Sequence, residues 1–182
     1  KLIKHFGAAQ WADGPPVAVE RTVDDLGGSR SGSRSAQTFR AEARGWGYHA
    51  GQQPYGSMTT AGLACVLLAQ SELLETGRLT GELRATAGKS LEDALAWMAL
   101  NYSTLENPRG PEGWYYYYLY GLERAMIFSR TKMLGGHDWY LDGAAVLIKK
   151  QDQGGSWGSV SDTSFALLFL RRATAPIAIT GD

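Results

Sequence analysis

The sequence has one cysteine, no excess of charge of either sign and no long apolar run. Because Cys65 has no second cysteine to pair with, no disulfide can form within the chain, and cysteine usage leaves the redox compartment open. The 18 Lys and Arg residues balance the 18 Asp and Glu residues, so net charge gives no reason to expect nucleic acid or an anionic membrane as a partner. The apolar run from Phe165 to Leu170 is far shorter than the roughly 20 residues that span a bilayer, so no membrane span is expected.

The 182 residues, 44% of them apolar and 20% charged, suit one soluble globular domain with a sizeable core. The chain begins at Lys1 rather than at a methionine, which leads us to expect a processed product or a fragment. The absence of a signal peptide therefore does not locate the protein. We leave the compartment open, with export from a bacterial cell as one option.

The clearest pattern is a unit that occurs three times, in which a Trp-bearing, Gly-rich loop precedes an apolar helix with a small residue before a leucine. The copies are Gly45-Trp46-Gly47 with Gly62-Leu63, Gly113-Trp114 with Gly121-Leu122, and Ser156-Trp157-Gly158 with Ala166-Leu167. A unit of this size cannot bury its own apolar face and must pack on its neighbours. The repeat therefore predicts stacked helical hairpins.

Apolar residues recur at helical spacing over five segments, which Gly- and Pro-rich turns separate. The predicted helices cover about residues 57–77, 81–102, 115–132, 138–150 and 161–175, and Ser57 and Asp138 are the expected N-caps. Residues 1–44 lack this pattern and are expected to form an irregular arm, in which the Gly/Ser/Arg-rich segment 26–35 is typical of a flexible loop or cleavable linker. The expected fold class is all-α, with antiparallel helical hairpins over residues 45–175 and a tail over 176–182.

The segment Gln151-Asp152-Gln153-Gly154-Gly155-Ser156-Trp157 has the Gln, Gly and Trp order of the QW repeat, and so resembles the α/α toroids of squalene–hopene cyclases and protein prenyltransferase β subunits. In that repeat an amide and an indole stack at a helix end and tie adjacent hairpins together. Longer segments resemble bacterial, notably planctomycete-type, prenyltransferase/squalene-oxidase repeat proteins; they lie at residues 45–48, 56–63, 114–123, 136–140 and 163–170. The resemblance implies a partial α/α toroid, of which this chain would be the C-terminal portion, and it implies no established activity.

Class II terpene cyclases protonate an alkene with an Asp-x-Asp-Asp-Thr motif, and the segment that resembles it here is Ser159-Val160-Ser161-Asp162-Thr163. Ser161 stands at the position of the proton donor, where a hydroxyl group is far too weak an acid to protonate an alkene. Asp162 is expected to be the N-cap of a helix that begins at Thr163. Cyclase chemistry is therefore not expected from this segment.

Prenyltransferase β subunits, which the repeat also resembles, hold zinc through Asp, Cys and His. The candidate ligands here are Cys65, His137 and Asp138, with His49 in reserve. A catalytic zinc needs three protein ligands that converge at about 2.0–2.3 Å. Because Cys65 is expected to be a buried, inert thiol on a helix and His137 to be a turn residue, we expect no metal or other cofactor.

The aromatic run from Trp114 to Tyr120 is the most distinctive local feature. On a helix these side chains cannot all face one way, so at least two must point into a cavity or into solvent. Tyrosines in such a place could stack on sugar rings or on an apolar ligand, or they could pack between helices. The candidate ligand-binding residues are Trp46, Tyr48, Trp114, Tyr117, Tyr118 and Tyr120.

We expect a scaffold that binds a small apolar ligand, a glycan or a partner protein on an aromatic inner face. The alternative is a toroid-family enzyme, terpene-cyclase-like or glycan-cleaving, in which Glu123 acts with Asp138 or Asp162. An enzyme requires two such groups to converge in a deep cavity, whereas a scaffold would use them as helix caps and ion pairs. An open stack of hairpins also exposes a terminal apolar face, so a homo-oligomer, or a missing N-terminal half that completes the ring, is a further expectation.

Overall fold

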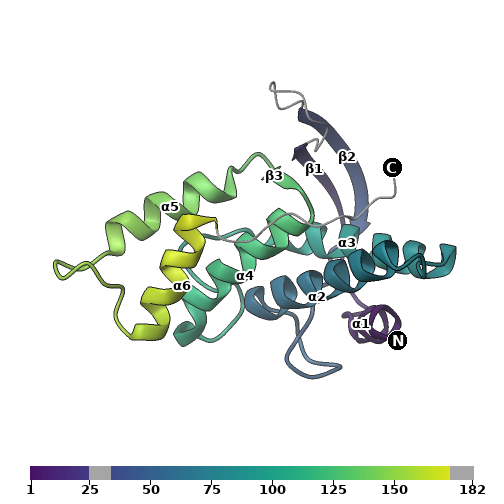
Figure 1. Ribbon diagram of the computed structural model, residues 1–182, viewed down its shortest axis with the longest axis horizontal. Coiled ribbons are helices and arrows are strands. Elements are labelled where there is room, and N and C mark those ends of the chain that lie inside the picture. The colour runs from purple at the N-terminus through teal and green to yellow at the C-terminus, as the bar shows by residue number, and fades with distance from the viewer. Residues whose placement is uncertain (25–33, 173–182) are drawn as a thin grey trace.

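The computed structural model describes residues 1–24 and 34–172 (Figure 1). Over these ranges the α-helices are α1 (Leu2–Ala9), α2 (Gly56–Glu75), α3 (Gly81–Leu100), α4 (Tyr115–Phe128), α5 (Trp139–Lys150) and α6 (Val160–Arg171). The strands are β1 (Pro16–Asp24), β2 (Arg34–Glu42) and β3 (Thr131–Leu134), and a short 3₁₀ turn, η1 (Glu112–Trp114), precedes α4. Most of the predicted linker 26–35 and all of the predicted tail 176–182 lie outside the described residues.

The prediction of an all-α fold is wrong, because the three strands form an antiparallel sheet in the order β2-β1-β3. Residues 1–44, expected to be an irregular arm, contain α1 and both long strands. In β1, the valines Val17, Val19 and Val23 recur with the two-residue period of a strand, and Val19 is buried. The sheet packs on α3 and projects from one side of the helices, while α5 and α6 form the left end of the molecule in Figure 1.

The helix predicted over residues 115–132 ends earlier than expected. Ser129 is the C-cap of α4, and Arg130 follows it in the left-handed region at φ 56°, which stops helical propagation. The next four residues then form β3, which pairs with β1 through Arg21 and Leu134. The end of the expected third helix is therefore the third strand of the sheet.

The remaining helix boundaries are close to the predicted ones. Asp138 is confirmed as the N-cap of α5, since its carboxylate accepts a hydrogen bond from the Leu141 N–H. The predicted cap of the last helix is wrong: Ser159 is the N-cap of α6, and Asp162 lies in the first turn. Helix α2 begins at Gly56, one residue before the predicted cap Ser57.

Helix α2 is the centre of the fold and contacts α1, α3 and α4. Leu63, Val66 and Leu67 on this helix are fully buried. By length and composition α2 could cross a membrane, and it is the one helix among the described residues that could. The apolar run from Phe165 to Leu170 is too short for this. The apolar composition of α2 also suits a helix of the core, because 56% of its most apolar stretch is buried inside the protein.

Small residues let the elements around α2 approach closely. A Cβ atom added at Gly62 would lie 2.5 Å from Cδ2 of Trp46, and one at Gly121 would lie 2.4 Å from Oγ1 of Thr60. The small residue of each repeat copy at these two positions is therefore a contact point, where a larger side chain has no room.

We expect Gly62→Ala to destabilise the protein by about 1–3 kcal/mol, because the methyl group must displace the buried Trp46 indole. Gly88→Ala is the matched control on α3, since a Cβ atom at Gly88 would meet no atom within 4 Å. This control should gain up to about 1 kcal/mol from the helix propensity of alanine. Urea unfolding followed by circular dichroism measures both changes, and equal effects of the two substitutions would contradict the close contact.

Candidate functional site: an aromatic groove

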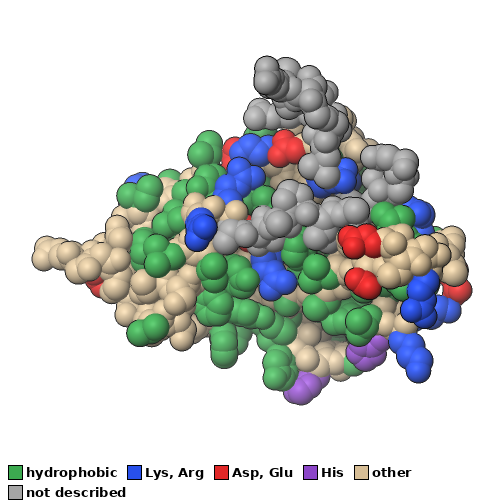
Figure 2. All heavy atoms as spheres, in the orientation of Figure 1, with side chains coloured by type: hydrophobic (Ala, Val, Ile, Leu, Met, Phe, Trp, Pro, Cys, Tyr) green, Lys and Arg blue, Asp and Glu red, His purple; other side chains and the backbone are tan. Residues whose placement is uncertain are grey.

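Two adjoining hollows form a groove between the loop after Trp46, helix α2 and the start of α4. Their volumes are about 330 and 540 Å³, and Tyr48, Met58 and Tyr117 line both of them. Tyr48 and Trp114 are 70% and 56% exposed, so more than half of each residue is open to solvent. Figure 2 shows apolar side chains gathered over the lower middle of the molecule, with histidines at their lower edge near α1. We call this feature the aromatic groove.

Trp46 is the rigid wall of the aromatic groove. Its indole Nε1–H donates to the carbonyl of Phe6 at 2.9 Å, and its backbone N–H donates to Oγ1 of Thr59 at 3.2 Å. Only 4% of Trp46 is exposed, and its ring lies against Gly62 of α2. The loop that follows carries Tyr48, whose ring meets that of His49 edge to face.

Helix α4 divides the aromatic run between the core and the surface. Tyr115 and Tyr118 point inward, and their hydroxyl groups donate to the carbonyls of Thr104 and Ser103. Tyr117 lines the aromatic groove and Trp114 meets it edge to face at the rim. Tyr120 instead stacks on Phe165 of α6 and takes no part in lining the groove.

Among the described residues that line the aromatic groove there is no Asp, Glu, Lys or Arg side chain. The titratable groups in this described lining are His5, His49, Cys65 and the tyrosines. Burial raises the pKa of the Tyr55 phenol, so its hydroxyl stays protonated at neutral pH and can donate a hydrogen bond. The described lining therefore presents aromatic rings, a few hydroxyl groups and two histidines, with no carboxylate, ammonium or guanidinium group.

Cys65 differs from its expected state, because it is exposed and lines the aromatic groove rather than the core. Burial of the sulfur still raises the pKa of the thiol, against the opposing effect of Arg124. A protonated thiol is a weak nucleophile, so Cys65 contributes a soft, apolar contact to the groove wall.

The three candidate catalytic acids do not line the aromatic groove. Asp138 caps α5 and forms an ion pair with Lys132 at 2.5 Å. Asp162 accepts a hydrogen bond from the hydroxyl of its helix cap, Ser159, at 2.6 Å. Glu123 is fully buried on α4. Two of the three acids thus have the capping and pairing roles that a scaffold predicts.

Asp138 gives a pH-dependent test of its structural role. Burial alone would raise its pKa, but the hydrogen bonds from Lys132 and from the Leu141 N–H outweigh burial and hold the pKa below its usual value. A lowered pKa in the folded state means that the stability from this group is present above about pH 4, the unfolded pKa, and is lost as pH falls through the folded value. We expect Asp138→Asn to be less stable than the parent at pH 6, and the difference to shrink as pH falls below about 4. Thermal unfolding across that range measures the difference, and a constant difference would contradict the assignment.

The candidate metal ligands are not brought together. Among the described residues, no group of three His, Cys, Asp or Glu side chains is placed to hold a metal ion. Cys65 lies on α2, while the imidazole of His137 stacks on Tyr102 at 4.1 Å and its Nδ1 lies 3.4 Å from Asp142. His49, the reserve candidate, is on the loop beside Tyr48.

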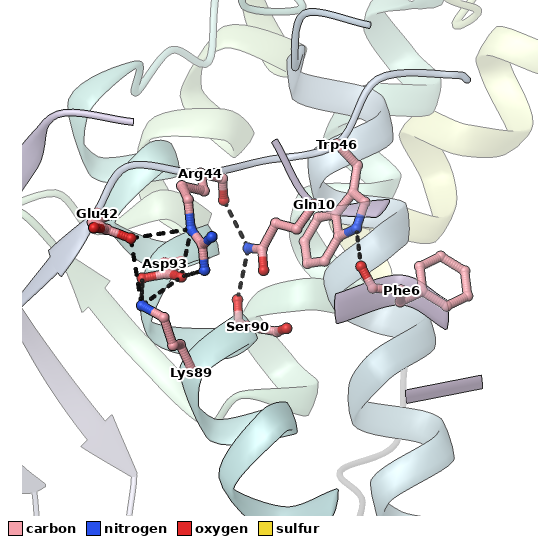
Figure 3. Close-up of polar contacts among 8 residues, drawn as sticks. All are labelled: Phe6, Gln10, Glu42, Arg44, Trp46, Lys89, Ser90 and Asp93. Carbon is pink, nitrogen blue, oxygen red and sulfur yellow. Dashed lines mark hydrogen bonds and ion pairs between the residues drawn. The ribbon is translucent and has the colours of Figure 1, made fainter. Parts of the chain in front are cut away.

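A polar cluster that the sequence did not reveal supports one side of the aromatic groove (Figure 3). Asp93 of α3 is fully buried, and the Arg44 guanidinium binds it with Nε at 2.8 Å and with its second nitrogen. Lys89 lies 3.2 Å from the same carboxylate and 3.5 Å from Glu42. Because Arg44 comes only two residues before Trp46, this cluster fixes the loop from which the groove wall rises.

Phe6, Tyr55 and Met58 also line the aromatic groove and were not among the predicted residues. Phe6 lies on α1, in the part of the chain expected to be irregular, so its place on a helix was not predicted. Comparison of the chain with protein-family models, with curated proteins and with solved structures finds no match.

Proposed function

We propose that this protein is a binding module whose aromatic groove takes an uncharged ligand with a flat apolar face. Such a ligand is either a sugar ring or a small hydrophobic molecule, and both present C–H surface to an aromatic ring. The observation that carries the proposal is the pair of exposed aromatic side chains, Tyr48 and Trp114, beside a groove whose described lining contains no Asp, Glu, Lys or Arg side chain.

The size of the groove also supports a small ligand. Hollows of 330 and 540 Å³ fall in the range of about 300–1,000 Å³ that small-molecule sites occupy. Large aromatic side chains are costly to leave in water, so two of them at the rim of one hollow favour contact with a further molecule. The protonated hydroxyl of Tyr55 offers a hydrogen bond that would orient the ligand.

The enzyme alternative has less support. General acid–base hydrolysis of a glycan needs two carboxylates on either side of the bond that breaks. The part of the groove lining that the structure describes contains neither Asp nor Glu, and Asp138 and Asp162 are held at helix N-termini. A binding role uses the rings that are present and needs no acid.

Ligand titration with two separate panels tests the proposal. Soluble oligosaccharides form one panel and small uncharged cyclic hydrocarbons and terpenoids form the other, and binding is read from the indole resonances in ¹H–¹⁵N spectra. We expect saturable binding to one panel, with the Trp114 indole among the resonances that move. Trp114→Ala and Tyr48→Ala should each weaken this binding about fivefold to tenfold, because each removes one ring contact.

Leu141→Ala is the matched control, since Leu141 is 62% exposed on α5 and does not line the groove. This variant should bind the ligand as the parent does. The absence of saturable binding to both panels would overturn the proposal, as would a ligand whose affinity is unchanged by both ring substitutions.

A further inference from the structure

Two loops of this protein make the same set of hydrogen bonds around a glutamine and a tryptophan. One loop connects α5 to α6 through Gln151 and Trp157, and the other connects α1 to α2 through Gln10 and Trp46. Each glutamine is the C-cap of its helix in an extended conformation, with φ and ψ of −66° and 137° at Gln10 and −64° and 131° at Gln151. We call these two loops the Gln–Trp turns.

The side chains of the two Gln–Trp turns make equivalent contacts. The amide of Gln10 donates to the carbonyl of Arg44 at 2.9 Å, and that of Gln151 donates to the carbonyl of Gly155 at 2.9 Å. In both turns this carbonyl belongs to the residue two positions before the tryptophan.

Each indole then returns to the preceding helix. Trp46 Nε1–H donates to the carbonyl of Phe6 at 2.9 Å, and Trp157 Nε1–H donates to that of Leu147 at 2.8 Å. Both acceptors lie four residues before the glutamine and also accept its backbone N–H. Each indole therefore ties its turn to the end of the preceding helix by the same kind of hydrogen bond (Figure 3 shows the bond of Trp46).

The following helices begin alike as well. The backbone N–H of Trp46 donates to Thr59 Oγ1, and that of Trp157 donates to Thr163 Oγ1. Three residues after each threonine comes the small residue of the repeat, Gly62 or Ala166.

The two Gln–Trp turns differ in the length of chain between glutamine and tryptophan, and in the loop from tryptophan to threonine, which are 13 residues apart in the first turn and 6 in the second. In the second turn, Asp152 N–H donates to the carbonyl of Ser156 at 2.9 Å and closes a short loop. In the first turn, Trp11 N–H donates to the carbonyl of Gly45, also at 2.9 Å, at the same positions relative to the glutamine and the tryptophan. The chain between Trp11 and Gly45 contains β1 and β2 and returns to the place that it left.

We infer that residues 11–45 are an insertion in a repeated Gln–Trp turn, and that the β1–β2 hairpin is a removable module mounted on a helical scaffold. Inserted segments are tolerated where their two ends lie next to each other. Here a backbone hydrogen bond joins the two ends. On this inference β1 and β2 are added to the helical scaffold, and β3, which follows α4, completes the sheet by pairing with β1. This inference goes beyond the proposed function and does not rest on it.

A turn exchange tests the inference. Residues 11–45 are replaced by Asp-Gln-Gly-Gly-Ser, the sequence of the second turn, so that Gln10 and Trp46 are joined as Gln151 and Trp157 are. Asp93→Asn is added, because the exchange removes Arg44 and would leave a buried carboxylate. We expect a helical circular dichroism spectrum, cooperative unfolding at a lower Tm, and the indole resonance of Trp157 at its parent position. A variant without helical structure would overturn the insertion.

A second measurement on the full chain tests the equivalence of the two turns by itself. Gln10→Ala should speed the hydrogen exchange of the Trp46 indole about tenfold and leave that of Trp157 unchanged, because each glutamine holds its own turn closed. Gln151→Ala should do the reverse. If Gln10→Ala leaves the Trp46 indole protected while Gln151→Ala exposes Trp157, the first turn does not work as the second does, and the inference fails.

Discussion

Arg44→Met should destabilise the protein by about 3 kcal/mol, because it leaves the Asp93 carboxylate buried without its main partner. Asp93 is fully buried, while Arg44 is mostly buried and binds it through two guanidinium nitrogens. Lys89 remains 3.2 Å away after the substitution, but its side chain is 58% exposed and cannot replace the fixed fork of the guanidinium. Chemical denaturation monitored by circular dichroism gives the change in unfolding free energy.

The double variant Arg44→Met with Asp93→Leu separates the cost of an unpaired charge from the value of the ion pair. Replacing a buried pair by apolar side chains of similar size is often neutral, so most of the lost stability should return. Lys4→Met is the control for an ordinary ion pair, since Lys4 and Glu82 are 58% and 72% exposed, and it should change stability by less than about 1 kcal/mol. If Arg44→Met costs no more than Lys4→Met, the buried cluster does not hold the loop.

Trp46→Ala should cost about 3–5 kcal/mol, the range for truncating a buried aromatic side chain. The indole is 4% exposed, fills the space above Gly62 and joins α1 to α2 through its hydrogen bond to Phe6. Differential scanning calorimetry should show a large drop in Tm. Trp46→Phe should lose less, because a ring remains in the space and only the Nε1–H bond disappears.

Trp114→Ala is the matched comparison at the rim of the aromatic groove. Trp114 is 56% exposed, so its removal should change stability by less than about 1 kcal/mol. The two tryptophans therefore differ in their surroundings: Trp46 is buried in the groove wall, and Trp114 is the exposed ring that we propose contacts a ligand. Equal losses of stability at both positions would contradict this division.

The parts of the fold that could be predicted are those fixed by local sequence. The helical spacing of apolar residues and the cap at Asp138 locate α5 within one residue, because both signals lie inside the element itself. The sheet was missed because the alternation of Val17, Val19 and Val23 is short, and because β3 lies where a helical pattern continues from α4. Strand pairing between residues this far apart depends on tertiary contacts that a local pattern does not contain.

The aromatic residue types of the candidate site could be predicted from the sequence, but which of these side chains line the groove could not. The run from Trp114 to Tyr120 indicates an aromatic surface, but only the packing of α4 decides that Tyr118 is buried and Tyr117 lines the groove. Gln10 was missed for a different reason: a β-hairpin separates it from Trp46, so the spacing that identifies Gln151 and Trp157 is absent. The residues of one turn can therefore be far apart in the sequence and still lie together in the structure.

The central position of α2 has a consequence for how the protein is made. The ribosome releases α2 before α3 and α4, the helices that cover two of its sides. During that interval the 20-residue apolar helix α2 lacks two of the three helices that pack on it in the described residues, and α1 is the one already synthesised. Synthesis of the next 50 or so residues is therefore the period of greatest exposure to aggregation and to factors that bind apolar nascent segments.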